Sequence, residues 1–315
     1  MKEFPLQEIE AALAEKNLLR LDTMAVPIQR VINKRDDYRS ILMLSAHNLK
    51  HLMKIPSLKA ECIMLNLEDG VSKEQKPFAL ALCAIFLTHY KDSEKKLVVR
   101  VNALDEGGYD EITYLNQFKP DAIRVPKIRT PKEVNNILHL LDEDIELHLS
   151  IETCEAWANL ASLKIDKRVK TFYLGILDLF ADMRLSQSHI KRDNPTMLYI
   201  LSHFLVTCKA IHVKPVSFMY QDFKNLDDFQ LWLELEKRMG YDAKGCISPD
   251  QVTLVNEIFK NEVAEIERAK IIVKLFEMHQ ELGISGFVDD EYGFIDEPIY
   301  KGALSILSRL GNDKT

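Results

Sequence analysis

Two carboxylates and one guanidinium lie at or near the ends of short apolar segments of this sequence. Glu152 and Asp178 each close such a segment, and Arg100 lies inside another one, LVVRVN. Two carboxylates held close together repel each other unless a cation lies between them. Mg²⁺ is commonly held by one or two carboxylates, and water and substrate oxygens complete its octahedron. The pair therefore predicts a site for Mg²⁺ or Mn²⁺, although a salt bridge to Arg100 or Lys127 is an alternative explanation.

Arg100 is flanked by valines on both sides. A buried arginine is costly unless it is paired. It could close a structural ion pair with Glu68 or Asp69. It could also direct a fixed guanidinium toward an anion, either a carboxylate or a developing enolate oxygen.

The elements that must position these side chains follow a repeated pattern. Short apolar segments, typical of buried parallel strands, alternate with helical patterns such as 73–90, 130–141, 195–212 and 226–239. Eight repeats of strand and helix favour an α/β fold of the (β/α)8 TIM-barrel type over an open doubly wound sheet. The eight segments are 41–45, 62–68, 97–102, 122–127, 147–152, 172–178, 216–220 and 245–248.

In such barrels the active site lies at the carboxyl ends of the strands. Polar residues that close the predicted strands should therefore meet at one rim, although the same residue types also cap helices. The predicted rim residues are Glu68, Asp69, Arg100, Asn102, Lys127, Glu152, Asp178 and Ser248.

The sequence predicts three parts in the chain. Residues 1–38 form an N-terminal extension, residues 39–260 form the barrel, and residues 261–315 form a C-terminal helical arm or lid. The last part begins with a long helical pattern over 262–282.

Composition excludes several classes of protein. A net charge of −7 disfavours nucleic-acid binding. The apolar runs are too short to span a bilayer, and the N-terminus does not resemble a signal peptide. None of the five cysteines forms a CxxC pair, which argues against a zinc site or a disulfide framework. We therefore expect a cytoplasmic protein without membrane or nucleic-acid partners.

The order of short motifs resembles the citrate lyase β-subunit-like and malyl-CoA lyase-like proteins of the HpcH/HpaI aldolase superfamily. Each motif is weak alone, but they occur in the same order along most of the chain. They are Arg39-Ser40-x-Leu42, Leu67-Glu68-Asp69-Gly70-Val71, Val99-Arg100-Val101-Asn102, Val125-Pro126-Lys127, Ile151-Glu152-Thr153, Gly175-x-x-Asp178-Leu179, Ser248-Pro249-x-Gln251 and Gly293-Phe294-Ile295-Asp296-x-Pro298.

The resemblance implies a role for each matching residue. Glu152 and Asp178 would bind Mg²⁺, and Arg100 would steady a carbonyl and its enolate. Asp296 would act as acid and base in the active site of a neighbouring subunit, so a homo-oligomer, a trimer or a hexamer, is expected. The remaining residues predicted to contact substrate or coenzyme A are Arg39, Glu68, Asp69 and Lys127.

The implied reaction is Mg²⁺-dependent cleavage of a carbon–carbon bond in a β-hydroxyacyl-CoA thioester of the malyl-CoA or citryl-CoA type. Two alternatives stay open: a metal-dependent 2-oxo acid aldolase or hydrolase that does not use coenzyme A in this way, and a non-catalytic subunit. The chain departs from the family pattern at Ser45-Ala46 and at Ser248, which points to a different substrate pocket.

Overall fold

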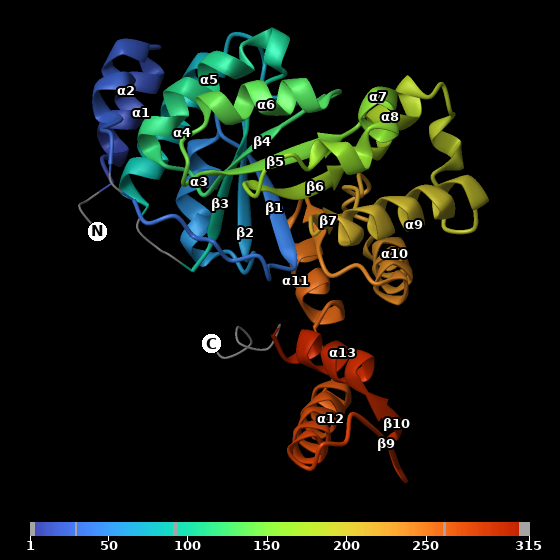
Figure 1. Cartoon of the computed structure of the whole chain (residues 1–315). Coiled ribbons are helices and arrows are strands. Elements are labelled where there is room, and N and C mark those ends of the chain that lie inside the picture. The colour runs from blue at the N-terminus through green and yellow to red at the C-terminus, as the bar shows by residue number, and fades with distance from the viewer. Residues whose placement is uncertain (1–3, 29, 91–93, 261–262, 309–315) are drawn as a thin grey trace. The chain divides into compact units, whose positions relative to one another are not determined.

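The computed structural model describes residues 4–28, 30–90, 94–260 and 263–308 (Figure 1). The chain divides into two compact units, Met1–Phe259 and Lys260–Thr315. The N-terminal extension belongs to the first unit, and each unit is described by itself below.

The first unit is built around eight parallel strands in the order β7-β6-β5-β4-β3-β2-β1-β8. A single parallel bridge between Ser217 and Lys244 joins the two edges, so the barrel is nearly closed. This confirms the predicted TIM-barrel type of fold. The strands are β1 (Ser40–Ser45), β2 (Cys62–Asn66), β3 (Lys96–Arg100), β4 (Ala122–Val125), β5 (Glu146–Ile151), β6 (Val169–Leu174), β7 (Lys214–Val216) and β8 (Lys244–Cys246).

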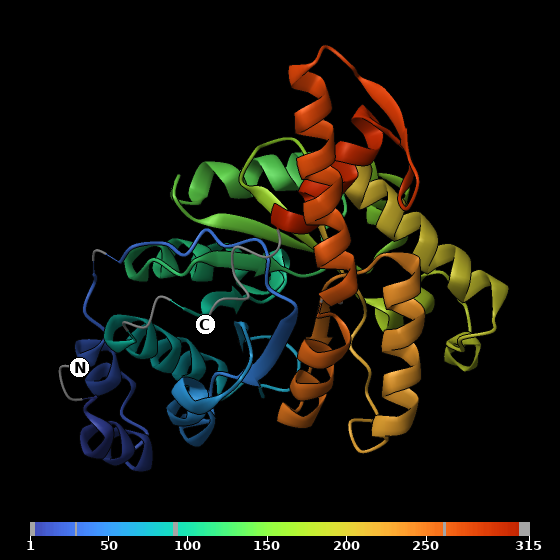
Figure 2. The ribbon, with the colours of Figure 1, turned by 90° about the horizontal axis from the view of Figure 1, so that it is seen from below.

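Helices lie outside the strands of this unit (Figures 1 and 2). Of the two N-terminal helices, drawn in dark blue, α2 packs against α4 and α1 packs against α2. Just after α2, the Val26 carbonyl oxygen accepts a hydrogen bond from the Thr88 hydroxyl of α4 at 2.9 Å. No helix in the described part of the chain is long and apolar enough to cross a membrane. The helices are α1 (Leu6–Ala14), α2 (Leu18–Met24), α3 (Leu49–Lys54), α4 (Lys76–His89), α5 (Gly108–Leu115), α6 (Pro131–Leu140), α7 (Cys154–Ala158), α8 (Ile176–Asp182), α9 (Pro195–Ala210), α10 (Leu226–Met239) and α11 (Pro249–Ile258).

The strands place alternate side chains on opposite faces, as a barrel requires. On β3, Leu97 and Val99 belong to the large apolar core, whereas Val98 belongs to a smaller cluster with Met64 and Tyr173. This smaller cluster marks the barrel interior, and residues that alternate with the large core face inward with it.

The interior also carries charge, most clearly along β5. Glu146, His148 and Ser150 are buried at every second position of this strand, and Glu152 continues the series just beyond its end. A column of polar side chains therefore runs from the amino-terminal end of the barrel toward its carboxyl-terminal rim.

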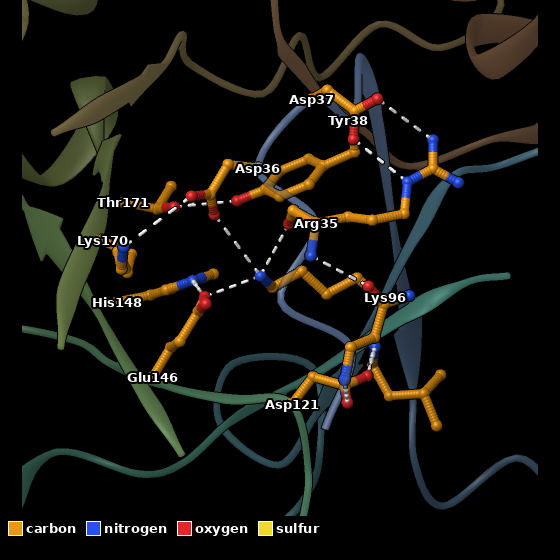
Figure 3. Close-up of polar contacts among 12 residues, drawn as sticks. Arg35, Asp36, Asp37, Tyr38, Lys96, Asp121, Glu146, His148, Lys170 and Thr171 are labelled. Carbon is orange, nitrogen blue, oxygen red and sulfur yellow. Dashed lines mark hydrogen bonds and ion pairs between the residues drawn. The ribbon is translucent and has the colours of Figure 1, made fainter. Parts of the chain in front are cut away.

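Figure 3 shows the amino-terminal end of this column. The Lys96 ammonium lies 2.6 Å from the Glu146 carboxylate and donates to the Arg35 carbonyl oxygen at 2.8 Å. His148 Nε2 lies 3.5 Å from the same carboxylate, and its Nδ1 lies 3.3 Å from the Tyr173 hydroxyl. This geometry fits a neutral imidazole whose Nε2–H faces Glu146. Burial lowers the pKa of His148, which has no solvent exposure, and hydrogen bonding to Glu146 only partly offsets that effect.

The second unit combines two helices with an antiparallel hairpin. Ile272, Phe276, Ile295 and Ala303 form its own small core. The hairpin was not part of the predicted helical arm, because its strands are only four residues long. The elements are α12 (Val263–Glu281), β9 (Gly286–Asp289), β10 (Gly293–Asp296) and α13 (Glu297–Ser308).

We predict that His148 makes stability fall as the solution becomes mildly acidic. The folded protein holds this histidine neutral at pH values where an unfolded chain, with a histidine pKa near ~6.5, takes up a proton. The contribution of neutral His148 to the free energy of unfolding should therefore be fully present above that value. It should decrease below it, by up to about 1 kcal/mol between pH 7.5 and pH 5.5. Urea unfolding at both values measures the loss.

The matched variants are His148→Gln and His139→Gln, the latter an exposed histidine on α6. His148→Gln should flatten the pH dependence whatever its stability at pH 7.5, and His139→Gln should leave it as in the wild type. Equal slopes in all three proteins would contradict the prediction.

Candidate functional site

The carboxyl ends of β2 to β5 bring four predicted rim residues together. Arg100 Nη2 lies 2.5 Å from Glu68 Oε2, and Lys127 Nζ lies 3.6 Å from Glu68 Oε1. The Lys127 backbone N–H donates to Glu152 Oε1 at 2.7 Å. Neighbouring parallel strands place their ends side by side, which explains how residues distant in sequence meet here.

Glu68 holds the Arg100 guanidinium in place. Arg100 is only 6 % exposed, so its charge needs a nearby carboxylate. Burial raises the pKa of Glu68, while Arg100 and the Asp69 backbone N–H, which donates at 2.9 Å, favour the charged form. Asp69 itself is largely exposed and lies 3.6 Å from Arg100. The ion pair between Arg100 and Glu68, one of the two roles that the sequence suggests for Arg100, is therefore present.

The same region contains buried polar atoms without hydrogen-bond partners. Among the described residues these include Glu68 Oε1, Arg100 Nε and Asn102 Oδ1. The Asn102 side-chain NH₂ group donates to Glu111 Oε1 at 2.5 Å, and the Asn102 Oδ1 atom has no donor. Buried polar atoms are rarely left unpaired in folded proteins. A polar ligand at this rim would supply partners for both a donor and two acceptors.

Lys127 connects Glu68 to Glu152. Its φ of 52° is left-handed, an uncommon conformation for a residue other than glycine. Burial works to lower the pKa of Lys127, but the charges of Glu68 and Asp69 outweigh it and raise that pKa. The side chain therefore remains a cation beside the site, and its predicted contact with substrate or coenzyme A stays a prediction.

Glu152 is packed against the start of α8. It is buried, and a Cβ atom added to Gly175 would lie 2.4 Å from Glu152 Oε2 and 2.6 Å from its Cβ. Only a glycine leaves this space for the carboxylate. Gly175 directly precedes α8, whose first turn carries Asp178. The local chain thus ties the Glu152 side chain to the element that bears the second predicted ligand.

The structure corrects the predicted position of Asp178. The segment 172–178 was expected to be one strand, but β6 ends at Leu174 and Asp178 is an exposed residue of α8. Ile176, Leu179 and Phe180 are buried at helical spacing, and this apolar face was taken for the end of a strand. Asp178 therefore follows the strand by one helical turn and does not close it.

Arg39 does not join the predicted site. It directly precedes β1, at the opposite end of the barrel from the rim. Its Nη2 lies 2.5 Å from Glu61 Oε1, and its backbone N–H donates to Glu61 Oε2. The structure therefore does not bring Arg39 to the rim, because residues that precede parallel strands lie on the face away from the carboxyl ends.

Ser248 and Asp296 act as helix caps in their own units. Ser248 accepts a hydrogen bond from the Gln251 backbone N–H at 3.3 Å at the start of α11. Asp296 ends β10 in the second unit, and its Oδ1 accepts from the Ile299 backbone N–H at 3.1 Å. Capping explains both residue types locally, and a role of Asp296 in the site stays a prediction.

Sequence analysis missed Arg124. This arginine is buried on β4, and its strand partner on β3 is Arg100. The signal that singled out Arg100, a charged residue inside an apolar strand segment, was also present in the segment AIRVPK. Arg124 lies inside its segment and not at the end, where polar residues mark the rim of a barrel.

Glu152 and Asp178 would give a divalent ion two carboxylate ligands and leave its other positions to water or substrate. Within the described residues, no group of three or more His, Cys, Asp and Glu side chains is arranged to hold a metal. A site with Glu152 and Asp178 would supply two carboxylates, the number that Mg²⁺ typically takes while keeping water or substrate oxygens. Structural zinc, which needs four protein ligands, does not fit these residues.

Comparison with known proteins identifies the group of enzymes to which this barrel belongs. The family model for HpcH/HpaI aldolase/citrate lyase matches residues 39–249, which includes all eight strands. The chain belongs to the HpcH/HpaI aldolase/citrate lyase family. It is therefore a member of an enzyme family that includes CoA-ester lyases.

Individual relatives of this family cover most of the chain. Mitochondrial citramalyl-CoA lyase of Rattus norvegicus is 28% identical over 288 residues, which cover 86% of this chain and 85% of the rat protein. A (3S)-malyl-CoA thioesterase of Cereibacter sphaeroides is 29% identical, over 76% of this chain and 83% of its own.

A solved structure shares the fold. The CitE protein of Mycobacterium tuberculosis, in complex with magnesium, acetoacetate and coenzyme A, has a TM-score of 0.68. The match has 20% identity and covers 87% of this chain and 98% of the other. This likeness concerns the fold.

We predict that Gly175→Ala destabilises this family member. The added methyl group has no room beside Glu152 and must displace it, a type of overpacking that costs about 1–3 kcal/mol. Urea unfolding measures the loss. Gly302→Ala on α13 is the control, because nothing lies within 4 Å of the added atom there. An unchanged stability of Gly175→Ala would show that the Glu152 side chain is not held as described.

Proposed function

We propose that this protein is a Mg²⁺-dependent carbon–carbon lyase that cleaves a β-hydroxyacyl-CoA thioester through a thioester enolate. The observation that carries the proposal is the Arg100 guanidinium, held by Glu68 at 2.5 Å, on the barrel rim that also carries Glu152. An enolate places new negative charge on one oxygen, and a preorganised cation is the group best suited to stabilise it.

Glu152 and Asp178 are the proposed metal ligands. When bound, Mg²⁺ supplies a Lewis acid and a template for the carboxylate and carbonyl oxygens of a 2-oxo acid. The Lys127 backbone N–H orients one oxygen of Glu152, and the space at Gly175 admits the other. Mn²⁺ satisfies the same oxygen ligands.

Arg100 is the proposed catalytic residue of the first unit. Its unpaired Nε–H is available to a thioester oxygen while Nη2 stays on Glu68. Glu68 and Asp69 would act on the substrate by orienting this guanidinium. The Lys127 ammonium would contact an anionic group, the carboxylate of the acid or a phosphate of coenzyme A.

Asp296 is the proposed group that moves the proton. A carboxylate can take the proton of the β-hydroxyl as the bond between Cα and Cβ breaks, and can return it in the reverse direction. We propose that Asp296 serves the site of a neighbouring copy in a trimer or hexamer. Its position at the start of α13 would give the carboxylate a fixed direction.

The substrate is proposed to be a CoA thioester of the malyl-, citramalyl- or citryl-CoA type. Two relatives named for citramalyl-CoA lyase and malyl-CoA thioesterase activity support this class. The second name favours one further candidate, hydrolysis of the thioester by the same site. Aldol cleavage of a 2-oxo acid without coenzyme A is the remaining alternative. The predicted cytoplasmic location stays a prediction, because the similar rat enzyme is mitochondrial.

A panel of malyl-, citramalyl- and citryl-CoA, each with Mg²⁺, tests the reaction by mass spectrometry. A lyase produces acetyl-CoA and an oxo acid, whereas a thioesterase produces free coenzyme A and a hydroxy acid. Arg100→Lys should lower kcat by roughly 10²–10³, because the donor fork is lost. Glu152→Gln and Asp178→Asn should lose the response to Mg²⁺.

The control for these variants is Arg39→Lys, at the opposite end of the barrel, which should keep wild-type kcat. If free coenzyme A is the only product that contains coenzyme A, the protein is a thioesterase and the lyase proposal is wrong. No turnover of any thioester, together with cleavage of a free 2-oxo acid, would favour the aldolase.

Mixing two inactive variants tests the role of Asp296 in a neighbouring copy. Asp296→Ala and Glu152→Ala proteins should each be inactive, and their mixed oligomer should regain activity because some sites then combine an intact Glu152 with an intact Asp296. Co-expression with two affinity tags isolates the mixed species for the assay. Absence of recovery in that species would contradict action between subunits.

A further inference from the structure

Arg124 is a second guanidinium inside the barrel, one layer below the candidate site. It lies on β4, its strand partner on β3 is Arg100, and it is only 5 % exposed. Its Nε–H donates to the Ser150 hydroxyl at 2.9 Å. Its guanidinium carbon lies 4.2 Å from the centre of the Tyr173 ring. The group is therefore fixed by a hydrogen bond and by a cation–π contact.

The partners of Arg124 lead directly to the site. Ser150 precedes Glu152 by one inward position on β5, and Tyr173 precedes Gly175 by two residues at the end of β6. A substitution of Arg124 would thus alter contacts with Ser150 and Tyr173, which lie just before Glu152 and Gly175 in the chain.

Arg124 also interacts electrostatically with charged residues of the site. Burial lowers its pKa to about 10, and the positive charge of Arg100 adds to this effect. The charges of Glu152 and Glu68 act in the opposite direction. At neutral pH the guanidinium stays charged, so it provides a permanent positive charge within electrostatic range of both carboxylates.

Such a charge has opposite effects on the empty and the metal-bound site. Without a cation, the carboxylates of Glu68 and Glu152 share one rim, and positive charge nearby offsets the repulsion between them. With a divalent cation bound, the same guanidinium repels it, and in a buried setting this repulsion is poorly screened.

We propose that Arg124 is a positioning residue that acts as a built-in counter-charge: it holds the acidic site residues together without metal and weakens the binding of a divalent cation. This inference rests on the proposed metal site at Glu152 and Asp178. It assigns Arg124 no contact with substrate. Its consequence is a site that binds Mg²⁺ reversibly and depends on substrate oxygens to complete the binding.

The test compares Arg124→Met with Arg124→Lys in the full-length protein. Mg²⁺ binding is measured by calorimetry without substrate, and melting temperatures are measured with and without Mg²⁺. Arg124→Met should melt below the wild type without Mg²⁺ and should bind Mg²⁺ about tenfold more tightly, the order expected when a unit charge near a divalent ion is removed. Mg²⁺ should therefore restore part of the lost melting temperature. Arg124→Lys keeps the charge and should keep the wild-type Kd.

A matched control separates this effect from general loss of a buried cation. Lys96→Met removes a cation that is 1 % exposed at the amino-terminal end of the barrel. It should lower the melting temperature equally with and without Mg²⁺ and leave the Kd unchanged. If Arg124→Met does not fold, Arg124→Gln, whose amide can still donate to Ser150, gives the same comparison.

The outcomes distinguish the two proposals. A wild-type protein that does not bind Mg²⁺ would overturn the metal site and this inference with it. A wild type that binds Mg²⁺, with an Arg124→Met or Arg124→Gln variant of equal or weaker affinity, would overturn the role of Arg124 alone. An Arg124→Lys variant as tight as Arg124→Met would also overturn it, because charge would then not be the cause.

Discussion

The pairing of Arg100 with Glu68 is the interaction on which the candidate site depends. A guanidinium at 6 % exposure has lost most of its hydration, and the carboxylate 2.5 Å away compensates for that loss. The pair joins β3 to the end of β2. Lys127 then extends it to β4, and the Lys127 backbone N–H extends it to Glu152. Four strand ends are connected in this way without a ligand.

Buried charges are paired in the rest of the barrel interior as well. Many barrels fill their interior with branched apolar residues, whereas this one places polar groups at alternate positions of β5. Buried charges of the interior have partners on other strands: Lys96 on β3 pairs with Glu146 on β5, across β4, and Arg124 on β4 pairs with Ser150 on β5. Pairing across strands makes the register of the barrel and the position of the site mutually dependent, because a shift of one strand would leave several charges unpaired.

Family membership and local geometry lead to compatible conclusions about chemistry. The HpcH/HpaI aldolase/citrate lyase family includes enzymes named for lyase and for thioesterase activity, so membership alone does not choose between them. If Arg100 is the catalytic residue, as proposed, the choice depends on which bond of the substrate lies near its guanidinium.

The sequence alone determined the strand–helix alternation, the barrel and most of the rim, because hydrophobic periodicity and the polar ends of apolar segments are local signals. Asp178 shows the limit of such signals, since ILDLF is apolar enough for a strand but is buried at helical spacing in α8. Only the tertiary structure decided that Arg39 pairs with Glu61 away from the rim and that Arg124 lies beneath it. Pairing between charges depends on which strands are neighbours and on their register, and these are properties of the closed barrel that no single segment carries.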